Sequence, residues 1–247
     1  MAVPFLSIII PAYNEEHRLP RTLEQVTEFL ARQSYSGEVI VVENGSRDRT
    51  LDMAREFARQ HENVRVFREV GRGKGLAVRR GMLEAQGEYR FICDADLSMP
   101  IDEVNAFLPP ALENFDIAIG SREARGSVRY DEPAYRHWGG RAINTAIRIL
   151  ILPGLQDTQC GFKCFTAAAA ADLFGLQTLQ GWSFDIEVLY LARRRKYRIR
   201  EVPIHWYFDP ETKLEAVRDG LHMIRDIFMV HLNALRGVYD RNPRSDV

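Results

Sequence analysis

Apolar and polar positions follow two different periods in the first half of the chain. Short, nearly continuous apolar runs are typical of strands buried on both faces of a sheet. Such runs lie at Phe5–Pro11, Glu38–Val42, Val64–Arg68, Tyr89–Cys93 and Asp116–Gly120. Between them, apolar residues recur every three or four positions and predict helices near Leu19–Leu30, Leu51–Ala58, Leu76–Ala85 and Val104–Leu112. Strands that alternate with helices predict right-handed crossovers and a mostly parallel sheet.

The second half of the chain has a less regular pattern. It predicts, in order, a polar loop at Gly126–Pro133, a helix at Ala142–Leu150, a strand at Gly161–Phe165, a helix at Trp182–Lys196, a strand at Arg200–Tyr207 and a long helix at Leu214–Leu235. We find neither an internal repeat nor a linker, so we predict one α/β domain over residues 1–247.

Composition and charge exclude several classes of protein. Hydrophobic residues make up 46% and charged residues 27%, which is typical of a globular domain. A net charge of −1 argues against nucleic acid as a partner, because phosphate binding needs a basic surface. Cys93, Cys160 and Cys164 form no disulfide framework, which fits a reducing compartment. No cationic leader or membrane-spanning run is visible, so we expect a cytoplasmic protein, free or lying on the cytoplasmic face of a membrane.

Polar residues follow four of the predicted strands. They are Tyr13-Asn14-Glu15, Glu43-Asn44-Gly45-Ser46, Asp94-Ala95-Asp96 and Ser121-Arg122. In sheets of this kind ligands bind beyond the carboxyl ends of the strands. Four polar strand ends on one sheet edge therefore predict a binding site.

Asp94 and Asp96 are the candidate metal ligands. Mg²⁺ and Mn²⁺ prefer hard oxygen ligands and often combine one or two carboxylates with substrate phosphates. A metal ion held there would stabilise the charge on a departing diphosphate. The alternative is a surface turn in which Asp96 or Ser98 caps a helix. The position of the pair after a buried strand, beside the other polar strand ends, favours the metal site.

Gly71-Arg72-Gly73-Lys74-Gly75 precedes a predicted helix and is a candidate anion site. Glycines admit backbone amides to an anion, a helix N-terminus favours negative charge, and Lys74 adds a full positive charge. The spacing is that of neither a P-loop nor a dinucleotide fingerprint. A flexible loop with a solvated lysine remains the alternative. Other cations, Lys163 among them, are more often solvated surface residues.

The order of these motifs resembles that of family 2 glycosyltransferases. The resemblance is carried by the segments 7–16, 41–50 and 94–96, by Gly120-Ser121-Arg122, by the segment 157–163, by Glu201-Val202-Pro203-Ile204 and by Thr212-Lys213-Leu214. It covers nearly the whole chain. Within the family the chain is most similar to the polyprenyl-phosphate branch, the dolichyl-phosphate glucosyltransferases and mannosyltransferases, with the glucosyltransferases nearer.

The resemblance implies a fold, an activity and a set of site residues. It implies a GT-A fold, a UDP-glucose donor with GDP-mannose as the alternative, Mg²⁺ or Mn²⁺ as cofactor, and transfer with inversion to a polyprenyl or dolichyl phosphate. The implied nucleotide-sugar site is Pro11, Tyr13, Glu15, Glu43, Lys74, Asp94, Ala95 and Asp96. The implied acceptor-phosphate residues are Arg122, Arg136 and Lys213, and the catalytic residues are Asp94, Asp96 and Arg122.

The resemblance also implies a division of the domain into parts. The chain departs from the family pattern in two respects. Residues 1–125 would bind the nucleotide sugar, residues 126–210 would form the acceptor side, and residues 211–247 would form a C-terminal amphipathic helix. Glu43-Asn44 stands where the family usually has two aspartates, which leaves the nucleotide preference open. Relatives often carry transmembrane helices, which we do not find, so lipid contact would fall to the helices around Ile143–Leu152 and Leu214–Leu235.

The chemistry of the acceptor separates the main hypothesis from its rivals. A phosphate monoester is largely a dianion at neutral pH and is already nucleophilic, so it needs cations rather than a general base. A sugar or other hydroxyl acceptor would need a carboxylate base, for which Asp185 and Asp157 are the candidates. A third possibility is a non-catalytic subunit that binds nucleotide sugars, and the intact Asp94 and Asp96 pair argues against it.

Overall fold

The computed structural model describes residues 3–131, 133, 151–209 and 216–240. In this part of the chain, a seven-stranded sheet has the order β3-β2-β1-β4-β7-β5-β8. Its strands are β1 (Leu6–Ala12), β2 (Gly37–Glu43), β3 (Val64–Arg68), β4 (Tyr89–Ile92), β5 (Ile117–Ser121), β7 (Lys163–Thr166) and β8 (Ile199–Pro203). The mixed α/β class that the sequence predicts is confirmed.

Strand direction decides which residues meet at the edge of the sheet. The strands β3, β2, β1 and β4 are parallel, and β5 is parallel to β8. Only β7 runs antiparallel to its neighbours β4 and β5 among the described strands of this sheet. The carboxyl ends of β1, β2, β4 and β5 therefore lie at the same edge as the amino end of β7. This arrangement brings the predicted polar strand ends together.

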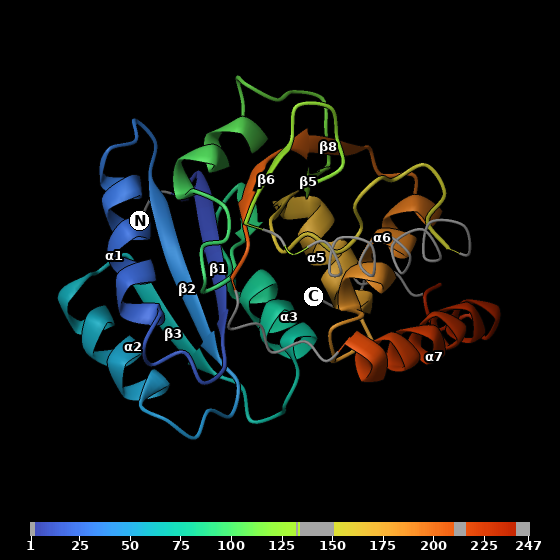
Figure 1. The fold of residues 1–247 in the computed structure, drawn as a ribbon, viewed down its shortest axis with the longest axis horizontal. Coiled ribbons are helices and arrows are strands. Elements are labelled where there is room, and N and C mark those ends of the chain that lie inside the picture. The colour runs from blue at the N-terminus through green and yellow to red at the C-terminus, as the bar shows by residue number, and fades with distance from the viewer. Residues whose placement is uncertain (1–2, 132, 134–150, 210–215, 241–247) are drawn as a thin grey trace.

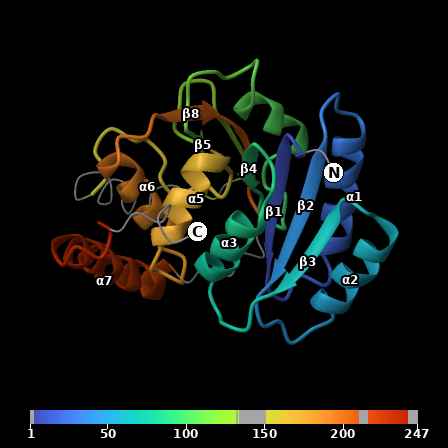
Figure 2. The same cartoon turned by 180° about the vertical axis from the view of Figure 1, so that it is seen from behind.

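Helices cover both faces of the sheet (Figures 1 and 2). They are α1 (Leu19–Ala31), α2 (Thr50–Gln60), α3 (Lys74–Glu84), the 3₁₀ helix η1 (Ile101–Phe107), α5 (Ala167–Leu176), α6 (Phe184–Arg194) and α7 (Ala216–Leu235). The core beneath α1, α2 and η1 contains Ile8 and Ile10 of β1, whereas Ile9 faces α3 and the helices α5 to α7. Because side chains alternate along a strand, a strand buried on both faces is apolar throughout.

Three predicted elements differ from the structure. The helix expected at Val104–Leu112 is the short η1, which ends before Pro109-Pro110, where two prolines lack the N–H that a helix needs. The strand expected at Arg200–Tyr207 is divided after Pro203 into β8 and β9 (His205–Tyr207). The loop expected at Gly126–Pro133 contains β6 (Val128–Tyr130), which pairs in parallel with β9.

The helices predicted for the second half of the chain agree with the structure only in part. The helix expected at Ala142–Leu150 lies outside the described residues. Helix α5 was not predicted, because its run of alanines shows no helical period in hydrophobicity; Thr166 caps it by accepting a hydrogen bond from the Ala169 amide at 3.3 Å. Helix α7 buries Met223 but exposes Ile224 and Phe228, so its amphipathic character is not confirmed. Within the described residues, no helix has the length and apolar content needed to span a bilayer.

Candidate active site

The loops after β1 and β2 are joined by hydrogen bonds. The Asn14 amide donates to Ser46 Oγ at 3.0 Å, and the Arg47 amide donates to Asn14 Oδ1 at 2.9 Å. Asn14 has a φ of 52°, a conformation that asparagine tolerates better than most residues. The Glu15 amide donates to Thr50 Oγ1 at 2.8 Å. These bonds fix the two strand ends that carry Tyr13 and Glu43.

Glu43 is the most buried carboxylate on this side of the site, with 1% of its surface exposed. Its Oε1 accepts a hydrogen bond from the Ser46 amide. Its Oε2 lies 3.5 Å from Arg68 Nε, and has no hydrogen-bond partner among the described residues. A buried carboxylate oxygen without a hydrogen bond is costly and is typical of a position that a ligand completes. Pro11 and Tyr13 are partly exposed on the neighbouring strand end.

Glu15, two residues after Tyr13, is held by an ion pair with Arg18. It accepts two hydrogen bonds from Arg18, at 2.7 and 3.0 Å. Arg18 also contacts Asp209 Oδ2 at 2.5 Å. This ion pair connects the first strand end to the segment that follows β9.

Asp94 and Asp96 follow β4 and lie in a common electrostatic environment. The Cys93 amide donates to Ile9 O at 2.9 Å, which holds the loop against β1. Asp96 Oδ1 accepts the Ser98 amide at 3.0 Å, as an N-cap-like contact would. Burial, and then the charge of Asp94, raise the pKa of the Asp96 carboxyl. Two neighbouring carboxylates that repel each other are a suitable donor set for a divalent cation.

Gly161 leaves the space that Asp94 occupies. A Cβ atom at position 161 would lie 1.9 Å from Asp94 Oδ2 and 2.7 Å from its Cγ. The contact arises because Gly161 precedes the antiparallel β7, whose amino end meets the carboxyl end of β4. Gly161 belongs to the segment 157–163 that carries the family resemblance, but the sequence pattern alone does not predict a role for it at the site.

Lys74 contacts one of the metal-ligand candidates, Asp94, directly. Its Nζ lies 2.6 Å from Asp94 Oδ1 and 5.3 Å from the ring centroid of Trp182. Burial lowers the pKa of Lys74, but the charges of Asp94 and Asp185 outweigh that effect and raise it. Lys74 is therefore a charged residue of the site, and not a solvated lysine in a flexible loop.

The glycines beside Lys74 serve a different purpose from the expected one. The Gly75 and Leu76 amides donate to Gly181 O and Gln180 O, each at 3.2 Å, so they do not face an anion. A Cβ at Gly73 would lie 2.2 Å from Gln180 O, and one at Gly75 would lie 2.8 Å from Leu179 O. The glycines admit the chain that connects α5 to α6, and this packing places Trp182 over Lys74.

A buried pair of opposite charges lies behind Lys74. Lys163 Nζ, with 1% of its side chain exposed, is 2.8 Å from Asp185 Oδ1 and donates to Cys160 O. Burial raises the pKa of the Asp185 carboxyl, although Lys163 and Lys74 both oppose the rise. From its sequence context, Lys163 is only one of several scattered cations, because a single lysine in a chain does not indicate a buried partner.

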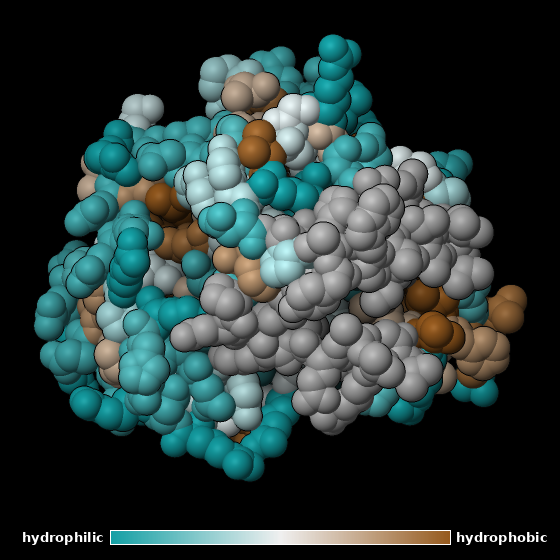
Figure 3. Space-filling view, in the orientation of Figure 1, coloured by the Kyte–Doolittle hydropathy of each residue, from teal (hydrophilic) through white to brown (hydrophobic). Residues whose placement is uncertain are grey.

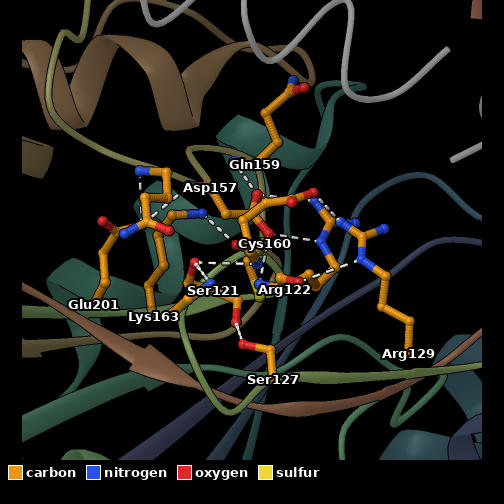
Figure 4. A network of polar contacts seen from close by, with 12 residues as sticks. Ser121, Arg122, Ser127, Arg129, Asp157, Gln159, Cys160, Lys163 and Glu201 are labelled. Carbon is orange, nitrogen blue, oxygen red and sulfur yellow. Dashed lines mark hydrogen bonds and ion pairs between the residues drawn. The ribbon is translucent and has the colours of Figure 1, made fainter. Parts of the chain in front are cut away.

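Arg122 is held in place by Asp157. Its Nε and Nη2 donate to the two carboxylate oxygens at 2.6 and 2.9 Å, and its own amide donates to Oδ2 at 3.0 Å (Figure 4). The guanidinium also stacks on Trp206, 5.4 Å from the ring centroid. A bidentate pair of this kind fixes direction as well as charge. Arg136 and Lys213, the other two predicted acceptor residues, lie outside the described residues.

The titration of Asp157 gives a prediction about stability. Burial would raise its pKa, but the charge and hydrogen bonds of Arg122 lower it to about 2. Such a carboxylate stabilises the fold by about 2 kcal/mol above pH 4, and the contribution disappears as pH falls from about 4 to about 2. We expect Asp157→Asn to lower the free energy of unfolding by about this amount at pH 7.

Urea unfolding of Asp157→Asn and the parent at several pH values checks this expectation. The difference should shrink below pH 4, because the parent then loses its paired carboxylate. Asp116→Asn is the matched control: Asp116 pairs with Arg198 at 3.0 Å at the surface, where solvent screens the ion pair and the loss should be smaller. A difference that is constant down to pH 2 would contradict the assignment.

The donor atoms around Asp94 and Asp96 fit a divalent metal. They are hard oxygens at a strand end, and Gly161 leaves room for one carboxylate. Within the described residues, no group of three or more His, Cys, Asp or Glu side chains is arranged to hold a metal. The two aspartates would therefore share the ion with oxygens from substrate or water, as is common for Mg²⁺.

Comparison with known proteins identifies the family. A model of glycosyl transferase family 2 matches residues 7–174. The dolichyl-phosphate beta-glucosyltransferase of Drosophila melanogaster is 36% identical over 252 residues, which are 95% of this chain and 76% of that protein. The human protein of the same name is 32% identical over 249 residues, with 95% of this chain and 77% of that protein covered.

Solved structures share the fold at lower sequence identity. The glucosyl-3-phosphoglycerate synthase of Mycobacterium tuberculosis in complex with uridine diphosphate has a TM-score of 0.65 and 19% identity, and covers 93% of this chain and 79% of that one. The complex of that enzyme with Mn²⁺, UDP-glucose and phosphoglyceric acid has a TM-score of 0.64 and 19% identity, with the same coverage. Both have the GT-A architecture that the sequence predicts. The chain belongs to glycosyl transferase family 2.

Proposed function

We propose that this chain transfers glucose from UDP-glucose, with inversion, to the phosphate of a polyprenyl phosphate such as dolichyl phosphate. The observation that carries the proposal is the meeting of Asp94 and Asp96 with Lys74 at the sheet edge where Arg122 is also held. The glucosyltransferase names of the relatives support glucose and the lipid phosphate. The UDP-glucose complex of the structural neighbour supports the donor, and GDP-mannose is the alternative.

The nucleotide sugar would lie across the ends of β1, β2 and β4. Tyr13 and the buried Glu43 would contact the nucleoside, with Pro11 and Glu15 at its border. Asp94 and Asp96 would hold Mg²⁺ or Mn²⁺ beside Ala95, and that ion would stabilise the charge that develops on the departing diphosphate. Lys74 lies 2.6 Å from Asp94 and would add a positive charge on the same side.

The acceptor side would lie around Arg122. Its guanidinium would orient the lipid phosphate, so that an oxygen of the dianion attacks the sugar carbon opposite the leaving group. Neither candidate base supports a hydroxyl acceptor: Asp157 binds Arg122 through both oxygens, and Asp185 is paired with Lys163. A phosphate acceptor needs no such base. The proposed division is a nucleotide-sugar half over residues 1–125 and an acceptor half over residues 126–210.

A membrane-bound acceptor requires contact with a lipid surface. The exposed apolar side chains of α7 support such contact: Ile224, Phe228 and Leu235 are 63, 68 and 86% exposed. Apolar residues gather over this corner of the molecule in Figure 3. Exposed apolar patches of this kind mark interaction surfaces. We therefore place the protein at the surface of a membrane, with α7 on the lipid side.

Product formation tests the function directly. The purified chain would be incubated in detergent with Mn²⁺, radiolabelled UDP-glucose and either dolichyl phosphate or dolichol, which differ only in the phosphate. We expect lipid-linked glucose with dolichyl phosphate alone, and much less product with GDP-mannose as donor. Glucosylation of dolichol or of water-soluble sugars, without a product from dolichyl phosphate, would favour the hydroxyl-acceptor enzyme. Donor binding without any transfer would favour a non-catalytic subunit.

A further inference from the structure

The two-stranded ribbon of β6 and β9 presents different side chains on its two faces. Arg129 is paired in register with Trp206 in the middle of the ribbon. Because side chains alternate along a strand, Val128 and Tyr130 lie on the other face, together with Tyr207. These three are 37, 36 and 44% exposed, whereas Arg129 and Trp206 are turned towards the site and are partly buried. The ribbon therefore places Arg129 beside Arg122.

Arg129 and Arg122 share one aromatic ring. Their guanidinium carbons lie 5.9 and 5.4 Å from the ring centroid of Trp206. Arg129 Nε donates to Arg122 O at 3.3 Å, and its Nη2 lies 2.5 Å from Glu123 Oε1. Figure 4 shows the two arginine side chains converging from different elements. Contact with the indole limits the movement of both guanidinium groups.

The guanidinium groups of Arg122 and Arg129 carry like charges, and each lies next to a carboxylate. Each guanidinium pairs with a carboxylate, Arg122 with Asp157 and Arg129 with Glu123. The partners differ in burial, because the Asp157 side chain is 2% exposed and that of Glu123 is 19% exposed. The Arg122 side chain is 23% exposed and that of Arg129 is 18% exposed, so solvent reaches both. Because Glu123 is more exposed than Asp157, the Arg129 pair is the one that an incoming anion can displace at the lower cost.

We propose that Arg129 is a second phosphate-binding cation of the acceptor site, acting beside Arg122, with Trp206 as the positioning residue for both. The proposal rests on the proposed function, since the ligand is the monoester phosphate of the lipid acceptor. A phosphate monoester has a second pKa near 6 and carries about two negative charges at neutral pH. Two guanidinium groups match that charge and bind the oxygens with directed hydrogen bonds.

The experiment compares KM for the two substrates in variants of Arg129. Arg129→Gln is expected to raise KM for dolichyl phosphate at least about tenfold, because a charge-assisted hydrogen bond is lost from a partly buried site. KM for UDP-glucose should stay within about twofold, since the proposed donor site lies across the ends of β1, β2 and β4 and does not include the β6–β9 ribbon. Arg129→Lys should recover part of the loss. The matched control is Arg198→Gln, which removes a surface arginine of an ion pair with Asp116.

A pH profile separates phosphate binding from a structural role. In the parent, KM for dolichyl phosphate should fall as pH rises from 5 to 7.5 and the phosphate gains its second charge. Arg129→Gln should flatten this profile, because one of the two cations that recognise the dianion is missing. A variant that only loosened the ribbon would raise KM at every pH by the same factor, and that result would overturn the proposal.

The remaining outcomes of these experiments also support or contradict the role of Arg129. If Arg129→Gln does not fold, calorimetric binding of a short-chain prenyl phosphate to Arg129→Lys replaces the kinetic measurement, and unchanged affinity contradicts the proposal. If the parent forms lipid-linked glucose and Arg129→Gln keeps the parental KM, Arg129 has only a structural role between the ribbon and β5, and the proposal is wrong. If the parent forms no lipid-linked glucose, the proposed function itself fails, and the two failures are distinguished.

Discussion

Asp96→Ala is expected to lower the turnover of UDP-glucose at least about a hundredfold, because it removes half of the donor set that would stabilise charge on the departing diphosphate. Asp94 alone would remain, and its Oδ1 already contacts Lys74 at 2.6 Å. Product formation should be measured over a range of Mn²⁺ concentrations. A higher metal concentration should restore only part of the activity.

Stability and a control variant separate this effect from misfolding. The Asp96 and Asp94 carboxylates repel each other, so we expect Asp96→Ala to keep or raise the melting temperature. The shift of that temperature by Mn²⁺ should be lost. Asp102→Asn, at a side chain 68% exposed that pairs with Arg32 on the surface, should keep full activity. Full turnover by Asp96→Ala would remove the proposed metal role.

Gly161→Ala is expected to have an effect of similar size through a single added methyl group. The new Cβ would lie 1.9 Å from Asp94 Oδ2, while Lys74 holds the other oxygen, so the carboxylate has to turn or shift. A displacement of about 1 Å at a reacting group commonly costs about a hundredfold in rate. We expect a loss of that order in product formation, with a weaker response to Mn²⁺.

The control for this variant is Gly181→Ala, because a Cβ at position 181 would meet nothing within 4 Å. That variant should keep the parental rate although it lies next to Trp182. Thermal unfolding of Gly161→Ala shows whether the loss is local, and we expect a melting temperature close to that of the parent. Parental activity in Gly161→Ala would mean that Asp94 does not need its observed position.

Much of the first half of the fold follows from the sequence. Strand β3 spans Val64–Arg68 as predicted, and the bounds of β1 and β2 shift by one residue at each end. The reason is that a strand buried on both faces must be apolar throughout, and this pattern is visible without tertiary information. The apolar pattern predicts a longer helix than the 3₁₀ helix η1, because this pattern continues into the Pro109-Pro110 pair.

The assembly of the candidate site depends on contacts between distant segments. Asp94, Asp96 and Arg122 are recognisable as polar ends of apolar strands, and Lys74 as a cation in a glycine-rich turn. Their partners are not, because Gly161 lies 67 positions after Asp94, and Trp206, which contacts both Arg122 and Arg129, comes from the distant strand β9. The periodicity of hydrophobic residues along the chain does not indicate which polar residues will face each other.

The sequence by itself determined the α/β class, the family and the polar ends of four strands, since local periodicity and short motifs are properties of neighbouring residues. The tertiary structure alone decided that β7 runs against its neighbours and brings Gly161 to Asp94, that the glycines beside Lys74 admit the chain before α6, and that Asp157 holds Arg122. The physical reason is that strand direction, burial of charge and pairing of charge are settled by the packing of segments distant in the chain.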